Sequence, residues 1–236
     1  MVWGLIAWST LNAQPRCAPP PPDLSAWFTF DEDLFRQAGE HRPDRVRGLV
    51  GTALRFNGKD QYFEIPAATA GLDAGEEDFT IELWIRTKDS VHTRNLVDKR
   101  DNHPVGYLIF LYKGHPGFQV DDGRVDGVVA RSQNIADSRW HHVAGVAKRL
   151  PLGSPEIYVD GEKQPDKGDH WTPLANLDVP SPLWLGRHHA NRAVDRENIF
   201  FEGEMDELSF YHRALTAAEI QSIFRAGSHG KCRPRH

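Results

Sequence analysis

The 236-residue sequence has no apolar run long enough to cross a membrane as a helix, which takes about 20 residues. It also has no excess of positive charge, because 28 Lys and Arg residues stand against 33 Asp and Glu residues, for a net charge of −5. Proteins that bind nucleic acid gather Lys and Arg to neutralise phosphates. The sequence therefore predicts neither membrane insertion nor a nucleic-acid partner, and its 39% apolar residues are ordinary for a globular protein.

Cysteine is almost absent, since the chain has only Cys17 and Cys232, one near each end. In an exported protein an even pair of cysteines indicates a disulfide, whereas two free thiols on loose tails are the alternative. A bridge over a loop of this length would restrain the unfolded chain by about 5 kcal/mol in the entropy model. We therefore expect a disulfide between these two residues if the protein is exported.

The N-terminus reads as an export signal. Residues 2–8 form a short apolar core, and Ala13 offers a small residue for cleavage before Gln14. We predict a signal peptide over residues 1–13 and a secreted, periplasmic or cell-surface location. The missing basic residues before the apolar core leave a disordered tail as the alternative. Residues 14–23 contain four consecutive prolines, which favour polyproline II over helix, so this segment is a stiff lead-in.

Between the two ends the pattern is almost entirely that of β-strands. Residues 78–87 alternate most clearly, with Phe79, Ile81, Leu83 and Ile85 on one face. The dipeptides at 57–58 (Asn-Gly) and 160–161 (Asp-Gly) predict tight hairpin turns. Residues 216–227 read as a helix with a capping box formed by its first residue, Thr216, and Glu219. This pattern predicts an all-β protein, a two-sheet antiparallel jelly-roll sandwich with one short C-terminal helix.

Six segments occur in an order that is typical of one family. They read GTALRFNGKDQYFEIP, DFTIELWIRT, RWHHVAGVA, IYVDGE, LWLGR and GEMDELSFYHRALTAAEI. Together they resemble the laminin G-like domain of the concanavalin A-like lectin/glucanase superfamily. The resemblance covers residues 24–227 and leaves a C-terminal tail at 228–236. It implies a jelly roll that is usually exported; many members bind glycans or proteins, and some hold a calcium ion.

An acidic stretch in the last of these segments raises the question of catalysis. Retaining glucanases of the superfamily resemble one another in a Glu-x-Asp-x-Glu strand motif, or in the same motif with one extra residue before the last Glu. Glu204 and Asp206 match its first two positions. The third position holds Leu208 or Ser209, so the second catalytic carboxyl, which must lie about 5 Å from the first, is missing. We therefore predict that the protein is not an enzyme, with an unusual polysaccharide hydrolase or lyase as an alternative.

The same stretch suggests a metal site. A period of two puts Glu204, Asp206, Leu208 and Phe210 on one strand face, which would place Asp206 at the inner edge of a sheet. Pairing of the first and last strands, which the resemblance implies, would bring Asp31 and Asn57 near Asp206 as ligands of a structural calcium ion. The alternative is that Asp206 accepts backbone hydrogen bonds and anchors the loop before the helix.

Four other residues are candidates for binding a ligand. Trp84 points away from the apolar face of its strand, and Trp171, beside His170, lies in a loop where its ring could stack on a sugar. Two polar loops, at 88–94 and 190–198, could form a rim of the kind that often carries function, and Arg192 belongs to the second of them. Burial under a neighbouring segment is the alternative for Trp84.

The twelve histidines also invite a zinc interpretation. His188 and His189 begin a loop and could reach a metal with His170 or Asp195, but no fixed ligand spacing supports this arrangement. We therefore predict no zinc site from the sequence. The function that the sequence supports best is a non-catalytic exported recognition module for a glycan or a surface protein. An adhesion module that binds no sugar is a further alternative.

Overall fold

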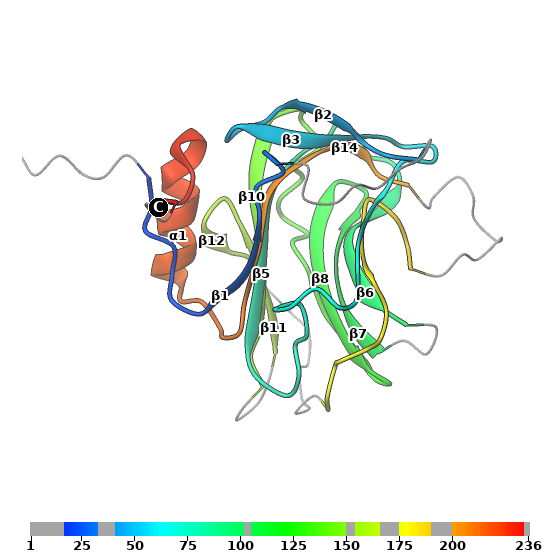
Figure 1. Ribbon diagram of the computed structural model, residues 1–236, viewed down its shortest axis with the longest axis vertical. Helices are drawn as coiled ribbons and strands as arrows, with labels where there is room; N and C mark the ends of the chain where they lie inside the picture. Colours follow the sequence, from blue (N-terminus) through cyan, green and yellow to red (C-terminus); the bar gives the residue numbers. More distant parts are fainter. Residues whose placement is uncertain are drawn as a thin grey trace, which may run out of the picture.

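The computed structural model describes residues 17–32, 41–101, 105–149, 154–165, 175–189 and 200–233. Over these residues the chain forms two antiparallel β-sheets stacked face to face, with one α-helix against the outer side of the larger sheet (Figure 1). The predicted all-β jelly-roll sandwich with a short C-terminal helix is therefore confirmed.

The larger sheet has eight strands and the smaller sheet has six. In spatial order the larger sheet contains β12 (Glu162–Lys163), β11 (Pro155–Val159), β10 (Trp140–Ala147), β5 (Phe79–Arg86), β14 (Glu202–Tyr211), β3 (Thr52–Asn57) and β2 (Asp44–Arg47), and β1 (Leu24–Phe28) also pairs with β14. The smaller sheet contains β4 (Phe63–Ile65), β13 (Leu183–Leu185), β6 (Thr93–Arg100), β7 (Val105–Tyr112), β8 (His115–Asp122) and β9 (Val125–Val129).

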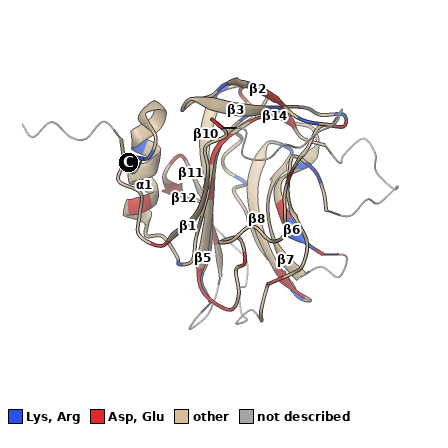
Figure 2. Cartoon of the chain, in the orientation of Figure 1, with Lys and Arg blue, Asp and Glu red and all other residues tan. Residues whose placement is uncertain are grey.

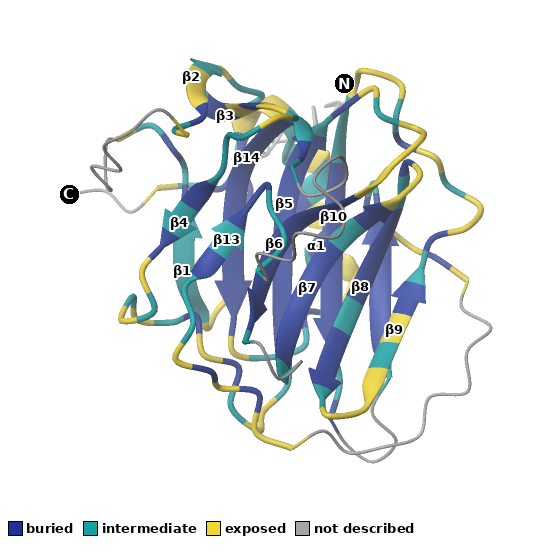
Figure 3. Cartoon of the chain, turned by 90° about the vertical axis from the view of Figure 1, so that its right-hand side faces the viewer, coloured by how far each residue is buried: buried dark blue, intermediate teal, exposed yellow. Residues whose placement is uncertain are grey.

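The core lies between the two sheets and is built from alternate residues of their strands. On β5 the side chains of Phe79, Ile81, Leu83 and Ile85 are at most 1% exposed and belong to this core, as the alternation predicts. Gly145 on β10 is a packing position, because a Cβ there would come within 2.4 Å of the Phe118 ring. Figure 3 shows the result, with buried residues along most of the strands and exposed residues gathered in the connections.

Helix α1 (Ala217–Ala226) covers the outer face of the larger sheet. Its capping box is present as predicted: Thr216 accepts a hydrogen bond from the backbone N of Glu219, whose carboxylate accepts one from the backbone N of Thr216. Ile220 and Ile223 are buried in a second apolar cluster on this face. A 3₁₀ turn (Gly227–His229) follows the helix and leads into the C-terminal tail.

One of the two predicted hairpins is present and the other is not. The Asp160-Gly161 turn joins β11 and β12, and both of its residues have positive φ, as such a turn requires. The hairpin at Asn57-Gly58 was a wrong prediction, because β3 and β4 belong to different sheets. The Asn57 side chain instead accepts three backbone hydrogen bonds, from Lys59, Asp60 and Gln61, and so shapes the crossover between the sheets.

A disulfide between Cys17 and Cys232 joins the two ends of the described chain, as predicted. Beside it Ala18 and Lys231 form a parallel bridge, and backbone hydrogen bonds run from Ala18 to Gly230 and from Cys232 to Ala18. The C-terminal tail is thereby held against the outer face of the larger sheet. The predicted signal peptide at 1–13 and the first residues of the lead-in lie outside the described residues.

Lys and Arg alternate with Asp and Glu along many of the described strands and connections (Figure 2). None of the described helices is long and apolar enough to pass through a membrane.

Candidate functional site

The acidic stretch of β14 is interrupted by a β-bulge. The pairing of β14 with β5 shifts its register between Asp206 and Ser209, and Glu207 adopts a positive φ of 56°. The extra residue reverses the alternation, so that Met205, Leu208 and Phe210 face the core. The prediction that Glu204 and Asp206 share a face with Leu208 and Phe210 was therefore wrong, because a period of two holds only where no bulge intervenes.

Glu204 lies on the outer face of β14 and is neutralised by two arginines. Its Oε1 accepts a hydrogen bond of 3.0 Å from Arg55 Nε, and its Oε2 accepts one of 2.6 Å from Arg86 Nε. The register explains this contact, since Glu204 stands opposite Arg55 on β3 and opposite Arg86 on β5. The carboxylate is only 6% exposed, so it organises the two guanidinium groups instead of facing a substrate.

Asp206 is fully buried and holds the loop between β2 and β3. Its Oδ2 accepts a hydrogen bond of 2.9 Å from the backbone N of Val50, while its Oδ1 has no hydrogen-bond partner within the described part of the chain. Burial is the main reason that the pKa of Asp206 is raised to about 7. The negative charges of Glu207 and Asp31 also raise this pKa, whereas the hydrogen bond from Val50 lowers it. The alternative interpretation, that Asp206 accepts a backbone hydrogen bond and anchors a loop, is therefore confirmed. The loop that it anchors precedes β3, however, and is not the predicted loop before the helix.

Glu207 and Glu82 share one buried cation, Lys231, which belongs to the C-terminal tail. Lys231 Nζ lies 2.8 Å from Glu82 Oε1 and 3.5 Å from Glu207 Oε2. Glu82 also contacts His142 Nε2 at 3.1 Å, and Trp27 Nε1 donates a hydrogen bond to Glu207. Burial alone would raise the pKa of Glu82, but Lys231 and His142 outweigh it and lower the pKa to about 2. This network fastens the tail to the sheet.

The three predicted calcium ligands are only partly brought together. Asn57 stands opposite Glu202 on β14, four residues along the strand from Asp206, and its side chain is used by its own turn. Asp31 acts electrostatically on Asp206, and its Oδ1 accepts a hydrogen bond of 2.8 Å from Thr52. The other oxygen of Asp31, Oδ2, pairs with Arg233, whereas Asp206 Oδ1 has no hydrogen-bond partner among the described residues. Calcium at these residues therefore stays a prediction.

Trp84 was a wrong prediction as a binding platform. It is 5% exposed, stacks on Phe224 of α1 with 5.8 Å between ring centroids and also contacts the ring of His142. The helix therefore covers the outward face of this strand. His170, Trp171 and Arg192 lie outside the described residues, and their role as ligand-binding residues stays a prediction.

A pocket of about 340 Å³ opens at one end of the larger sheet, on the face that carries Glu204. It is lined by Arg55, Phe56, Arg86, Thr87, Lys88, Ser138, Glu202, Gly203 and Glu204. The Arg86 guanidinium lies over the Trp140 ring at 5.0 Å, and Lys88 pairs with Glu202 at 3.1 Å. Three cationic and two anionic side chains therefore meet beside a partly exposed tryptophan.

The sequence indicated only part of this pocket. Lys88 belongs to a polar rim loop at 88–94, but Arg55, Arg86 and Trp140 read as ordinary strand residues. Arg86 and Trp140 pair directly between β5 and β10, and Arg55 reaches the same place from β3 through β14. Only the order of strands in the sheet brings these residues together.

Comparison with known protein families shows to which family the chain belongs. Residues 57–221 match a laminin G family model described as the concanavalin A-like lectin/glucanases superfamily. No curated protein matches the sequence.

Solved structures share the fold at low identity. One is the binding domain of Paraclostridial Mosquitocidal Protein 1, with 21% identity and a TM-score of 0.65 over 86% of this chain and 51% of that chain. Another is domain 4 of AbnA, a GH43 extracellular arabinanase from Geobacillus stearothermophilus solved with arabinotriose, with 17% identity and a TM-score of 0.56 over 78% of this chain and 82% of that chain. The binding domain of botulinum neurotoxin serotype G matches with 14% identity and a TM-score of 0.58 over 85% of this chain and 46% of that chain. The chain thus spans about half the length of the mosquitocidal binding domain.

Proposed function

Because the chain belongs to the laminin G-like family of the concanavalin A-like lectin/glucanases superfamily, we propose that it is a non-catalytic recognition module that binds a glycan through the pocket at Arg55, Arg86 and Glu204. The observation that carries this proposal is the pocket itself, where two arginines are fixed by one buried carboxylate beside Trp140.

The chemistry of the pocket suits a saccharide. Among the described residues, Glu204 contacts Arg55 through Nε, so the two terminal nitrogens of that guanidinium can donate to hydroxyl or carboxylate oxygens of a ligand. Because Glu204 holds both arginines in place, little side-chain entropy is lost on binding. Trp140 supports the pocket from beside it, because its ring packs against the Arg86 guanidinium and so helps to hold it in place. AbnA domain 4, a structural relative, was solved with arabinotriose, although a likeness at 17% identity concerns the fold alone.

A non-catalytic role is supported by the state of the acidic residues on β14. Glu204 is neutralised by arginines, and Asp206 and Glu207 are at most 1% exposed. Neither arrangement offers the two accessible carboxyls about 5 Å apart that retaining hydrolysis needs. We propose further that the protein works outside the cytoplasm, because a disulfide between its ends suits an oxidising compartment.

A glycan array probed with the full chain tests the proposal, followed by titration calorimetry with each sugar that binds. We expect reproducible binding that Arg55→Ala weakens at least about tenfold, because each hydrogen bond to a charged donor contributes about 1.5–3 kcal/mol. Arg225→Ala, which removes an exposed arginine on α1, is the matched control and should leave affinity unchanged. Arg55 is half exposed, so its loss should not unfold the protein.

Other outcomes would replace this proposal. Sugar binding that survives Arg55→Ala and Lys88→Ala would move the site away from the pocket. The absence of any sugar hit, together with binding to surface proteins, would favour an adhesion module. Release of reducing sugar from a β-glucan, abolished by Asp206→Ala, would establish a hydrolase.

A further inference from the structure

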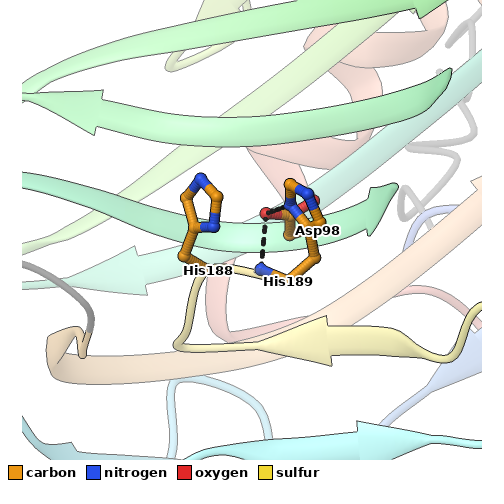
Figure 4. A group of neighbouring side chains, drawn as sticks. All are labelled: Asp98, His188 and His189. Atoms are coloured by element: carbon orange, nitrogen blue, oxygen red, sulfur yellow. Dashed lines mark hydrogen bonds and ion pairs between the residues drawn. The ribbon is translucent and has the colours of Figure 1, made fainter. Parts of the chain in front are cut away.

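Two histidines and an aspartate far apart in the sequence meet on the outer face of the smaller sheet. His188 and His189 follow β13, and Asp98 lies on β6, which pairs with β13 so that Trp184 stands opposite Asp98. Nitrogen and oxygen atoms of Asp98, His188 and His189 lie within 4.8 Å of one another (Figure 4). His189 is about 90 residues from Asp98, which is why no spacing in the sequence reveals the group.

The atoms of this group are of the type and spacing that zinc takes. His189 Nδ1 lies 3.1 Å from Asp98 Oδ2, and the two imidazole rings stack with 4.5 Å between centroids. Ligands at 2.0–2.1 Å from a tetrahedral zinc ion are roughly 3.3 Å apart. The closest pair is therefore already at ligand spacing, and the third ligand has to close by about 1.5 Å at most.

Arg100 at present supplies the positive charge in this group. Its Nε lies 2.9 Å from Asp98 Oδ1, and its Nη2 lies 2.9 Å from Asp98 Oδ2 and 3.4 Å from His188 Nε2. The guanidinium thus contacts the carboxylate and one of the imidazoles together, and Asp98 Oδ2 also accepts hydrogen bonds from Asn95 Nδ2 and from the backbone N of His189. A metal ion can bind only if Arg100 finds another anionic partner, because a buried guanidinium without one is costly.

Asp121 offers that partner. Arg100, Gly106 and Asp121 lie in one row across β6, β7 and β8, with the glycine between the two charged residues. Asp121 is fully buried, and its Oδ2 has no hydrogen-bond partner among the residues that the structure describes. The middle residue has no side chain to separate them, and it has to be glycine, because its φ is 127° and a Cβ would come within 2.0 Å of the Lys99 carbonyl oxygen. The charge of Arg100 already acts on Asp121.

We propose that Asp98, His188 and His189 form a binding site for a divalent transition-metal ion and that Arg100 moves from Asp98 to Asp121 when the ion binds. Two imidazoles and one carboxylate suit zinc, and the same donors accept nickel or cobalt. The proton between His189 Nδ1 and Asp98 leaves to solvent as the metal takes its place. The ion then balances the charge of Asp98, and Arg100 balances the charge of Asp121.

Titration calorimetry of the tag-free full chain with zinc chloride, and visible absorption with cobalt chloride, test this proposal. We expect one zinc per chain and cobalt bands typical of four or five ligands. His189→Gln, whose amide still donates to Asp98, should remove the binding, while His229→Ala, at an exposed histidine after α1, should not. One-site binding that persists in His189→Gln, or no binding to the wild-type chain, would refute the site.

Two further variants test the movement of Arg100. Asp121→Asn should weaken zinc binding by about 10–100-fold, because it removes the new partner of the guanidinium. Arg100→Gln should strengthen binding, because it removes the competing cation. Circular dichroism confirms that each variant is folded, and if Arg100→Gln does not fold, Asp121→Asn decides. Unchanged affinity in Asp121→Asn, or weaker binding in folded Arg100→Gln, would show that Arg100 does not exchange.

Discussion

Asp206 and Leu208 point to opposite faces of β14 although only one residue separates them. The bulge at Glu207 makes the difference, because it adds one residue to the strand without adding one to its partner. Leu208 enters the core, and Asp206 lies under the loop between β2 and β3. The acidic residues of this stretch therefore organise loops and tails, which accounts for their number without invoking catalysis.

Replacement of Lys231 by methionine should be strongly destabilising. Lys231 is 4% exposed and is the cation closest to both Glu82 and Glu207. Its loss leaves Glu82 with His142 and Glu207 with Trp27 as partners but removes the lysine charge that both share, and breaking a buried pair in this way costs about 3–5 kcal/mol. Urea unfolding gives the free energy directly. The exposed Lys59→Met is the control, and a loss of less than about 1 kcal/mol in Lys231→Met would contradict the buried network.

Stability should fall in acid as Glu82 becomes protonated. Its folded pKa of about 2 lies below the unfolded value of 4.5, so its contribution is complete above pH 4.5 and is lost as the pH falls toward 2. The difference corresponds to about 3 kcal/mol at most. Urea unfolding between pH 7 and pH 2.5 measures the profile. Glu82→Gln should flatten it over this window, and a parallel profile for the variant would show that Glu82 is not responsible.

Reduction of the Cys17–Cys232 disulfide should lower the melting temperature by roughly 10–20 °C. The bridge spans 215 residues, and a loop of this length restrains the unfolded chain by about 5 kcal/mol. Reduction also frees the tail that carries Lys231. Thermal unfolding with and without dithiothreitol measures the change. The double variant Cys17→Ser, Cys232→Ser should melt at the reduced temperature and ignore the reductant.

Calcium at Asp31 and Asp206 stays a prediction that chelation tests. If the ion binds there, EDTA should lower the melting temperature by several degrees at neutral pH, and added calcium should restore it, because a ligand of the folded state stabilises it by RT ln(1 + [L]/Kd). Asp206→Asn should abolish the response. Asn57→Ala should retain it, since Asn57 only shapes its own turn. Identical melting with EDTA and with calcium would exclude the ion.

Local patterns predicted the elements well where one segment carries its own signal. The alternation of residues 78–87, the capping box at Thr216 and the Asp160-Gly161 turn each depend on residues within a few positions, and each is present. The same reasoning failed at Asn57-Gly58, where a good turn sequence leads from one sheet to the other. A turn dipeptide sets the local backbone but cannot specify which strand lies beside the next one.

The sequence by itself determined the class of fold, the family, the helix and its cap, and the two cysteines that pair. Tertiary structure alone decided that Trp84 lies under α1, that Arg55 and Arg86 share Glu204, and that Asp98 meets His188 and His189. The physical reason is the range of the interactions. Side-chain period and capping act within a few residues, whereas the order of strands, a single bulge and the packing of a helix act between segments that the sequence keeps far apart.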